Sequence, residues 1–163
     1  MSKYSFDHGL VSSEDKLRET HIVDIDKLRQ EVTRVVEASD DYVILDGHYA
    51  QDLVSESLVS KVLVLRKAPW FLKHDLERRG YSRGKVLENL EAEIMGICLN
   101  ESLTLFPAEK VCEIDTTNNT KEKTLEEAIN LLNNHNGCDR ERIDWLTSEE
   151  TLNLLREANV HNR

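Results

Sequence analysis

Glycine and proline are scarce in this sequence, and so are cysteine and long apolar runs. Six glycines and two prolines among 163 residues exclude a collagen-like or low-complexity chain. With 39% hydrophobic and 32% charged residues, the composition is typical of a helix-rich globule. At this length we expect one substantial core, with an appendage, rather than two full domains.

The three cysteines are too dispersed for the common cysteine-based sites. Cys98, Cys112 and Cys138 form no C-x-x-C pair, and their number is odd. The sequence therefore predicts neither a zinc site nor a disulfide framework. We expect reduced thiols in an intracellular protein.

Positive charge and membrane signals are also in short supply. The formal net charge of -10 argues against broad binding to nucleic-acid backbones, because that affinity comes mainly from Lys and Arg. No apolar run approaches the roughly 20 residues that span a bilayer. The first 16 residues have no apolar centre of the kind found in signal peptides. We therefore predict a cytoplasmic protein without a membrane partner.

Short apolar runs indicate four strands. Two of them, "YVILD" at 42–46 and "KVLVLR" at 61–66, do not alternate with polar residues, as expected for strands that are covered on both faces. Two weaker candidates are "HIVDI" at 21–25 and "KVCEI" at 110–114.

Helical periodicity fills the intervals between these runs. Helices are expected from Asp26 with Asp24 or Asp26 as the cap, from Pro69 to Gly80, from Ser82 to about residue 103, and from a capping box at Thr124 and Glu127. Strands that alternate with helices predict parallel β-α-β units and an α/β fold.

The tail from Gly137 differs in character from the rest. A second capping box at Thr147 and Glu150 precedes Leu152, Leu154 and Leu155, which predicts one added helix. A terminal helix that packs on the body is the more common interpretation, and a partner-binding element is the alternative.

An acid ends the 42–46 run, and a histidine follows two residues later. In open parallel sheets ligands bind beyond the carboxyl ends of strands, so Asp46 is a candidate ligand of Mg²⁺ on nucleotide phosphates. For a lone motif of this kind, a turn capped by Asp46 through Gly47 is the more frequent explanation. His48 could orient water or exchange a proton near neutral pH, or it could be a solvated loop residue.

A basic segment interrupts the acidic chain at "RRGYSRGK". Two arginines at a helix end, followed by a glycine hinge and further cations, suit a flap that closes over phosphates. A solvated helix junction is equally compatible, because Arg is favoured near helix C-termini. The cations are Arg78, Arg79, Arg83 and Lys85, around Gly80 and Gly84.

These segments together resemble a known family. "YVILDGHYA", "VLVLRKAPWFLKHDLERRGYSRGKVLENLEAEI" and "HIVDIDKL" look like the adenylate-kinase-like ATPases of archaea and eukaryotes that assist small-ribosomal-subunit assembly. The most specific part is R-G-Y-x₃-K-x₂-E-N-x-x-x-E, from Arg79 to Glu93. The resemblance covers roughly residues 5 to 134 and implies a P-loop NTPase-like parallel sheet flanked by helices.

The resemblance also implies roles for individual residues. Asp46 would be the Walker B acid and the Mg²⁺ ligand, and His48 the histidine of an Asp-x-His motif. Residues 78–88 would form the lid, with Arg79 facing ATP and acting in catalysis. Segment 115–119 would pass near the adenine, and Arg66 would either approach phosphates or be structural. The implied nucleotide-binding residues are Arg79, Arg83, Arg66, Asp115 and Thr116.

The same resemblance implies the organisation and the partners. Residues 1–136 would form the adenylate-kinase-like core, with the nucleoside-monophosphate-binding region at about 1–23, and residues 137–163 a C-terminal helical extension. The implied ligands are ATP, Mg²⁺ and AMP or another nucleoside monophosphate. A small-subunit ribosomal protein or pre-rRNA is the implied macromolecular partner, and a monomer and a weak dimer both stay open.

One expected motif is absent from the sequence. Members of this family begin with a strand and a Walker A loop, G-x-x-x-x-G-K-[ST], and the chain contains no such pattern. In the resembled fold that strand lies between the strands ending at Asp46 and Arg66. Without it, unsatisfied backbone groups cost about 1–3 kcal/mol each unless the two strands pair directly or borrow a strand.

We therefore expect that Met1 is an internal methionine or a misassigned start. An in-frame strand and phosphate loop encoded upstream would support this expectation, and an in-frame stop codon would contradict it.

Two functional hypotheses follow. The first is a nucleoside monophosphate kinase, ATP + AMP = 2 ADP, with ATPase activity and a role in small-subunit ribosome biogenesis. The alternative is a non-catalytic or truncated adenylate-kinase-like protein that binds a ribosome-assembly partner.

Overall fold

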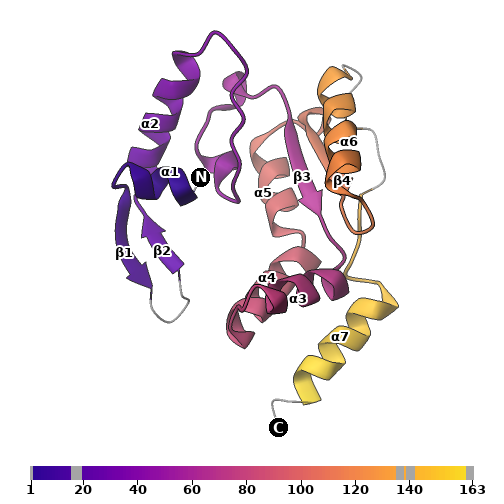
Figure 1. The fold of residues 1–163 in the computed structure, drawn as a ribbon. Coiled ribbons are helices and arrows are strands. Elements are labelled where there is room, and N and C mark those ends of the chain that lie inside the picture. The colour runs from indigo at the N-terminus through magenta and orange to yellow at the C-terminus, as the bar shows by residue number, and fades with distance from the viewer. Residues whose placement is uncertain (1, 16–19, 135–137, 139–141, 161–163) are drawn as a thin grey trace. The chain divides into compact units, whose positions relative to one another are not determined.

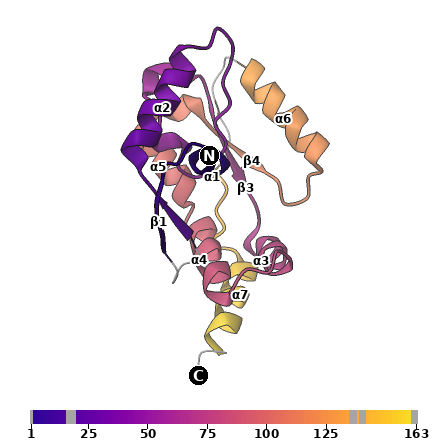
Figure 2. The ribbon, with the colours of Figure 1, turned by 60° about the vertical axis from the view of Figure 1, so that its left-hand side comes forward.

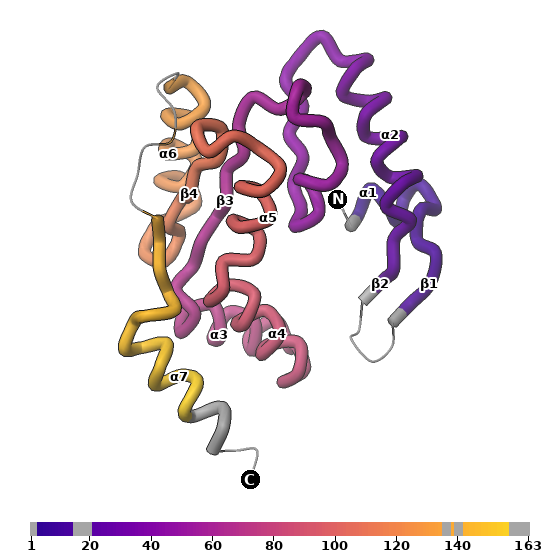
Figure 3. Tube along the Cα trace, turned by 180° about the vertical axis from the view of Figure 1, so that it is seen from behind, coloured from indigo at the N-terminus to yellow at the C-terminus, as the bar shows by residue number. Residues whose placement is uncertain are grey.

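The computed structural model describes residues 2–15, 20–134, 138 and 142–160. The chain divides into two compact units, Met1–Ser60 and Lys61–Arg163. Figures 1 and 3 trace the chain from opposite sides. Among the described residues, none of the helices combines the length and the apolar character that crossing a membrane requires.

The first unit combines a strand hairpin with one long helix. Strands β1 and β2 pair antiparallel, with a register shift between Val11 and Ser13. The elements are α1 (Ser2–Asp7), β1 (Val11–Asp15), β2 (Thr20–Val23), α2 (Ile25–Glu37) and two short 3-10 helices (Ala50–Asp52 and Glu56–Leu58).

Helix α2 forms as its sequence pattern predicts. The Asp24 carboxylate accepts a hydrogen bond from the backbone N–H of Lys27 and caps the helix. That bond, together with the nearby Lys27 side chain, holds the pKa of Asp24 below its usual value. Leu28 and Val32 recur on one face and pack against Leu53 in the core of this unit. The cap and the apolar face therefore come from the same short stretch of sequence.

The strand predicted at 42–46 is wrong. None of the sheets in the described part of the chain includes these residues. Tyr42 is 94% exposed and Ile44 is 86% exposed, and only Leu45 of this run packs against the core of the first unit. A strand requires a neighbour for its backbone hydrogen bonds, and an apolar run alone does not supply one.

The second unit is built on a parallel strand pair. Strands β3 (Val62–Arg66) and β4 (Val111–Asp115) pair in parallel from Val62 opposite Val111 to Arg66 opposite Asp115. Helices α5 (Ile97–Leu105) and α6 (Lys121–Asn133) lie on opposite faces of the pair, as Figure 2 shows. The predicted mixed α/β fold with parallel strands and flanking helices is thus confirmed. The other elements are α3 (Pro69–Arg78), α4 (Arg83–Ile94), a 3-10 helix (Ala108–Lys110) and α7 (Glu149–Val160).

A glycine divides the helix that was predicted to run from Ser82 to about residue 103. Gly96 has φ +60, in the left-handed region that side chains rarely adopt, and it separates α4 from α5. Periodicity continues across this break because both helices bury an apolar face. A pattern of apolar residues therefore does not reveal the break.

Two predicted helix caps are displaced. Helix α6 begins at Lys121, with Thr120 rather than Thr124 as its N-cap. Before α7, the hydroxyl of Ser148 accepts from the N–H of Thr151, whereas the hydroxyl of Thr147 donates to Asp144. The Asp144 carboxylate accepts from that hydroxyl and from a backbone N–H, and both bonds lower its pKa. The added C-terminal helix itself is confirmed.

The expectation of three reduced thiols is wrong. Cys112 and Cys138 form a disulfide, and Cys98 is the one free cysteine among the described residues. The two bonded residues are 26 positions apart in sequence, but the fold brings their Cα atoms within 5.0 Å. Sequence spacing could not show this proximity, because it arises only where the folded chain places Cys138 beside β4.

The displaced cap at α6 can be tested by a matched pair of substitutions. Thr120→Ala removes the side chain that accepts from the N–H of Lys123 and should lower the free energy of unfolding by about 1 kcal/mol. Thr124→Ala lies inside the helix and should change it by less than about 0.5 kcal/mol. Urea denaturation followed by circular dichroism measures both values, and the opposite ranking would restore Thr124 as the cap.

The disulfide can be tested by counting thiols. Unfolded in guanidinium without reductant, the protein should present a single reactive thiol per chain, and all three cysteines should react after reduction. Cys98→Ser serves as the control, because it should remove the thiol that reacts before reduction. Three reactive thiols before reduction would contradict the disulfide.

Candidate functional site

The carboxyl end of the β3–β4 pair gathers three of the residues predicted to bind nucleotide. Arg66 and Asp115 face each other as register partners at the ends of the two strands. The backbone N–H and the hydroxyl of Thr116 both donate to the carbonyl oxygen of Arg66, each at 2.8 Å. The chain leaving β4 is thereby fixed to the end of β3.

The Arg66 side chain points into the protein. The residue is 2% exposed, and its Nε and Nη1 atoms donate to Glu93 Oε1 at 2.8 Å and to Glu113 Oε1 at 2.6 Å. Nη2 donates to the backbone carbonyl of Glu93 at 2.9 Å. These contacts favour the structural role over the phosphate-binding role, because protein acceptors already hold the guanidinium.

The loop after β4 is organised by its own side chains. Asp115 Oδ1 accepts from the N–H of Thr117, and the carbonyl of Asp115 accepts from Asn119 Nδ2, both at 2.8 Å. The Thr117 hydroxyl accepts from the N–H of Ala68, just before α3. The loop is therefore tied both to itself and to the start of the next helix.

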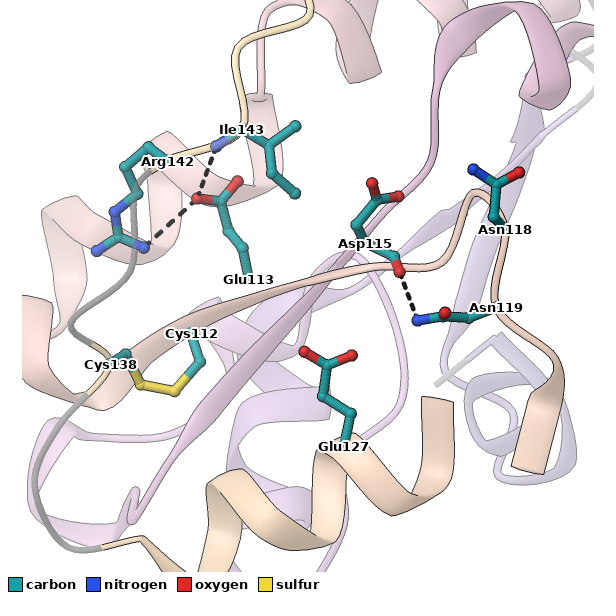
Figure 4. Close-up of a pocket in the computed structure, with 9 residues that line it drawn as sticks. All are labelled: Cys112, Glu113, Asp115, Asn118, Asn119, Glu127, Cys138, Arg142 and Ile143. Carbon is teal, nitrogen blue, oxygen red and sulfur yellow. Dashed lines mark hydrogen bonds and ion pairs between the residues drawn. A yellow bond between two sulfur atoms is a disulfide. The ribbon is translucent and has the colours of Figure 1, made fainter. Parts of the chain in front are cut away.

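A pocket of about 340 Å³ opens beside this loop. Figure 4 shows Arg142 and Ile143 bonded to Glu113 on one side of the strand, with Glu127 projecting from α6 on the other. Acidic and amide groups dominate the lining, so the pocket suits a neutral group with hydrogen-bond donors better than a phosphate. The lining residues are Cys112, Glu113, Asp115, Asn118, Asn119, Glu127, Cys138, Arg142 and Ile143.

The predicted lid is the turn between α3 and α4. Arg79 is the C-cap of α3, Gly80 follows with φ +76, and the Ser82 hydroxyl caps α4 by accepting from the N–H of Lys85. Arg78, Arg79 and Arg83 are exposed. We call residues 78–85 the basic tip of the α3–α4 hairpin. The base of this hairpin follows the carboxyl end of β3, and the tip is its other end (Figure 1).

A cation that the sequence reasoning did not single out lies at the base of this hairpin. Lys67 directly follows β3, and its Nζ contacts Asp75 Oδ2 of α3. This hydrogen bond lowers the pKa of Asp75. The only sequence signal is a basic residue beside Arg66, and nothing in the spacing indicates its partner.

Asp46 and His48 belong to the first unit, whereas the other candidate residues belong to the second. Both are exposed; His48 lies in a turn, and Asp46 lies just before that turn. The carbonyl of His48 accepts from Gln51 Nε2 at 2.9 Å, and its ring lies 4.0 Å from the Tyr49 ring. In the part of the chain that the structure describes, no group of three or more His, Cys, Asp or Glu side chains is arranged to hold a metal ion. The predicted site residues therefore fall into two sets, one in each unit.

The buried position of Arg66 leads to a stability prediction. Arg66→Ala leaves Glu93 and Glu113 without their shared partner and should lower the free energy of unfolding by about 3–5 kcal/mol. Arg79→Ala is the control, because its side chain is exposed and its loss should change that value by less than about 0.5 kcal/mol. Equal effects in urea denaturation would contradict the buried network.

Comparison with known proteins gives one family match. A family model described as "AAA domain" matches residues 1–96, more than half of the chain.

Archaeal relatives named "Putative adenylate kinase" align with most of the chain. The protein of Saccharolobus solfataricus is 34% identical over 160 residues, which cover 96% of this chain and 78% of the relative. That of Methanocaldococcus jannaschii is 35% identical over 138 residues, covering 85% and 72%. That of Thermococcus kodakarensis is 34% identical over 154 residues, covering 92% and 81%. The chain therefore belongs to the AAA-domain family, and it is homologous to these archaeal proteins named "Putative adenylate kinase".

Proposed function

We propose that this protein is a nucleoside monophosphate kinase that transfers a phosphoryl group from ATP to AMP and so forms two ADP. The observation that carries the proposal is the α3–α4 hairpin, which starts at the carboxyl end of a parallel strand pair and ends in the exposed basic tip. Ligands of open parallel sheets bind at that end. The names of the archaeal relatives support the same reaction.

The basic tip matches the electrostatic demand of phosphoryl transfer. This chemistry depends mainly on positioning and on neutralising the charge of the phosphate oxygens. Exposed guanidinium groups such as those of Arg79 and Arg83 can bind phosphate oxygens in a bidentate manner. The turn at Gly80 provides a point at which the tip can close over a nucleotide.

The loop after β4 suits the other end of a nucleotide. Asp115, Asn118 and Asn119 offer carbonyl and carboxylate oxygens to the pocket, and these groups accept hydrogen bonds from an exocyclic amino group. The nearby carboxylates disfavour phosphates at this place. We therefore assign the base to the loop side, with Asp115 and Thr116 beside it, and the phosphates to the basic tip.

Asp46 is the residue assigned to Mg²⁺. Its single exposed carboxylate fits this ion, because Mg²⁺ on nucleotides keeps several waters and is bound by one or two carboxylates together with the phosphates. When bound, the ion supplies further neutralisation of phosphate charge. His48, two residues away, would orient the acceptor or a water. Arg66 has no place in this scheme, because Glu93 and Glu113 bind its guanidinium inside the protein.

A second candidate function is that of a non-catalytic adenylate-kinase-like protein that binds a small-subunit ribosomal protein or pre-rRNA. The 163 residues contain no G-x-x-x-x-G-K-[ST] pattern, so they include no phosphate loop of that type. ATPase activity and a role in small-subunit assembly belong to the kinase proposal as further expectations.

The kinase proposal is tested by measuring ADP formed from ATP, AMP and Mg²⁺ by ion-exchange chromatography. Arg79→Ala and Asp46→Ala should each lower kcat/KM by about 100-fold or more, because Arg79 would place a positive charge on the transferring group and Asp46 would hold the Mg²⁺ that neutralises it. Lys73→Ala is the matched control, because it removes a cation of α3 away from the basic tip and should leave the rate unchanged.

The outcome that contradicts the proposal is equally specific. A folded wild-type protein that forms no ADP from any nucleoside monophosphate would exclude the kinase reaction. Retained binding to a small-subunit component in the same preparation would then select the alternative.

A further inference from the structure

One carboxylate oxygen joins three separate segments of the second unit. Glu93 Oε1, near the end of α4, accepts from Arg66 Nε at 2.8 Å, from the backbone N–H of Lys67 at 3.2 Å and from Trp145 Nε1 at 3.0 Å. Lys67 lies just before α3, and Trp145 lies in the C-terminal tail. The two ends of the α3–α4 hairpin and the tail therefore meet at a single atom, at the end of the hairpin opposite the basic tip.

The tail is anchored a second time on β4. The N–H of Ile143 donates to Glu113 Oε2 at 3.4 Å, and the carbonyl of Ile143 accepts from Arg66 Nη1 at 3.4 Å. Arg142 lies 3.6 Å from the same Glu113 oxygen. With Glu93, the network contains two guanidinium groups and two carboxylates, so its formal charges balance. A balanced and hydrogen-bonded set of this kind can remain buried and fixes the geometry of the groups that form it.

Beyond this anchor the tail runs along the hairpin. The Trp145 ring packs edge-to-face on Trp70 of α3, with centroids 5.7 Å apart. Helix α7 contacts α3, as Figure 1 also shows. Leu154 of α7 packs against the cluster that holds the hairpin together, which consists of Leu76, Val86 and Leu90, with Leu72 beside it. The tail thus contacts the hairpin both at its base and along its side.

We propose that residues 142–156, which we call the C-terminal brace, set the position of the basic tip, with Glu93 and Trp145 as positioning residues. The proposal rests on the proposed function, because the tip matters only if it binds nucleotide phosphates. It gives the tail a role beyond stabilising the body of the protein. Nucleotide affinity and turnover then depend on side chains at the far end of the hairpin.

The length of α3 explains how a contact at the base of the hairpin can affect the position of the basic tip. Helix α3 has 10 residues and is therefore about 15 Å long, so a tilt of about 5° at its base moves the tip by roughly 1 Å. A displacement of about 1 Å at a catalytic group can cost a factor of about 100 in rate. Contacts at Glu93 and Trp145 that prevent a small tilt are therefore sufficient to govern catalysis at the tip.

The proposal is tested by placing spin labels on the two helices and measuring the distance between them. Labels at Glu77→Cys in α3 and Lys123→Cys in α6, on a Cys98→Ser background, report the position of the hairpin relative to the strand pair. Trp145→Ala should broaden the distance distribution about two-fold and lower kcat/KM for ATP about ten-fold. Trp145→Phe keeps a ring against Trp70 but loses the N–H donor, and it should produce a smaller change of the same sign.

Leu146→Ala is the matched control, because this side chain of the same segment is 55% exposed and should leave both readouts unchanged. An unchanged distance distribution in Trp145→Ala would overturn the brace. If the backbone amides of β3 and β4 in Trp145→Ala also lose their protection from hydrogen exchange, the brace is overturned too. Trp145 would then serve the general stability of the second unit. If Trp145→Ala broadens the distance distribution but the protein with native Trp145 shows no turnover, the brace is retained and the kinase proposal is rejected.

Discussion

The buried guanidinium of Arg66 is the constraint on which the second unit depends. A permanent charge with almost no exposure must be matched by carboxylates, and these come from α4 and β4. Because Glu93 and Glu113 also bind Trp145 and Ile143, satisfying one charge brings the tail to the same place. The end of a strand, the end of a helix and a C-terminal segment therefore converge for an electrostatic reason.

The second unit has its clustered positive charges and its clustered carboxylates in different places. The protein as a whole is acidic, but the basic tip collects exposed arginines around a glycine turn. The pocket beside β4 collects carboxylates and amides instead. Under the proposed function this separation orients a nucleotide, because phosphates are repelled from the pocket and attracted to the tip.

Local sequence signals predicted an element correctly where the residues that determine it lie within one short segment. Helix α2 has its cap at Asp24 and an apolar stripe, and α3 begins at Pro69 and ends before Gly80. The same signals failed where a distant partner decides the outcome. Segment 42–46 has the composition of a strand but no neighbour in a sheet, while β1 forms from a polar stretch because β2 pairs with it.

The sequence by itself determined the mixed α/β class, the basic turn around Gly80 and the helical tail, because each depends on residues a few positions apart. Only the tertiary structure decided that Arg66 is an internal cation rather than an exposed one, and that Cys112 and Cys138 are bonded. It also decided that Glu93 and Trp145 meet. These contacts join residues that are 26 to 52 positions apart, and their geometry exists only after the chain has closed those distances.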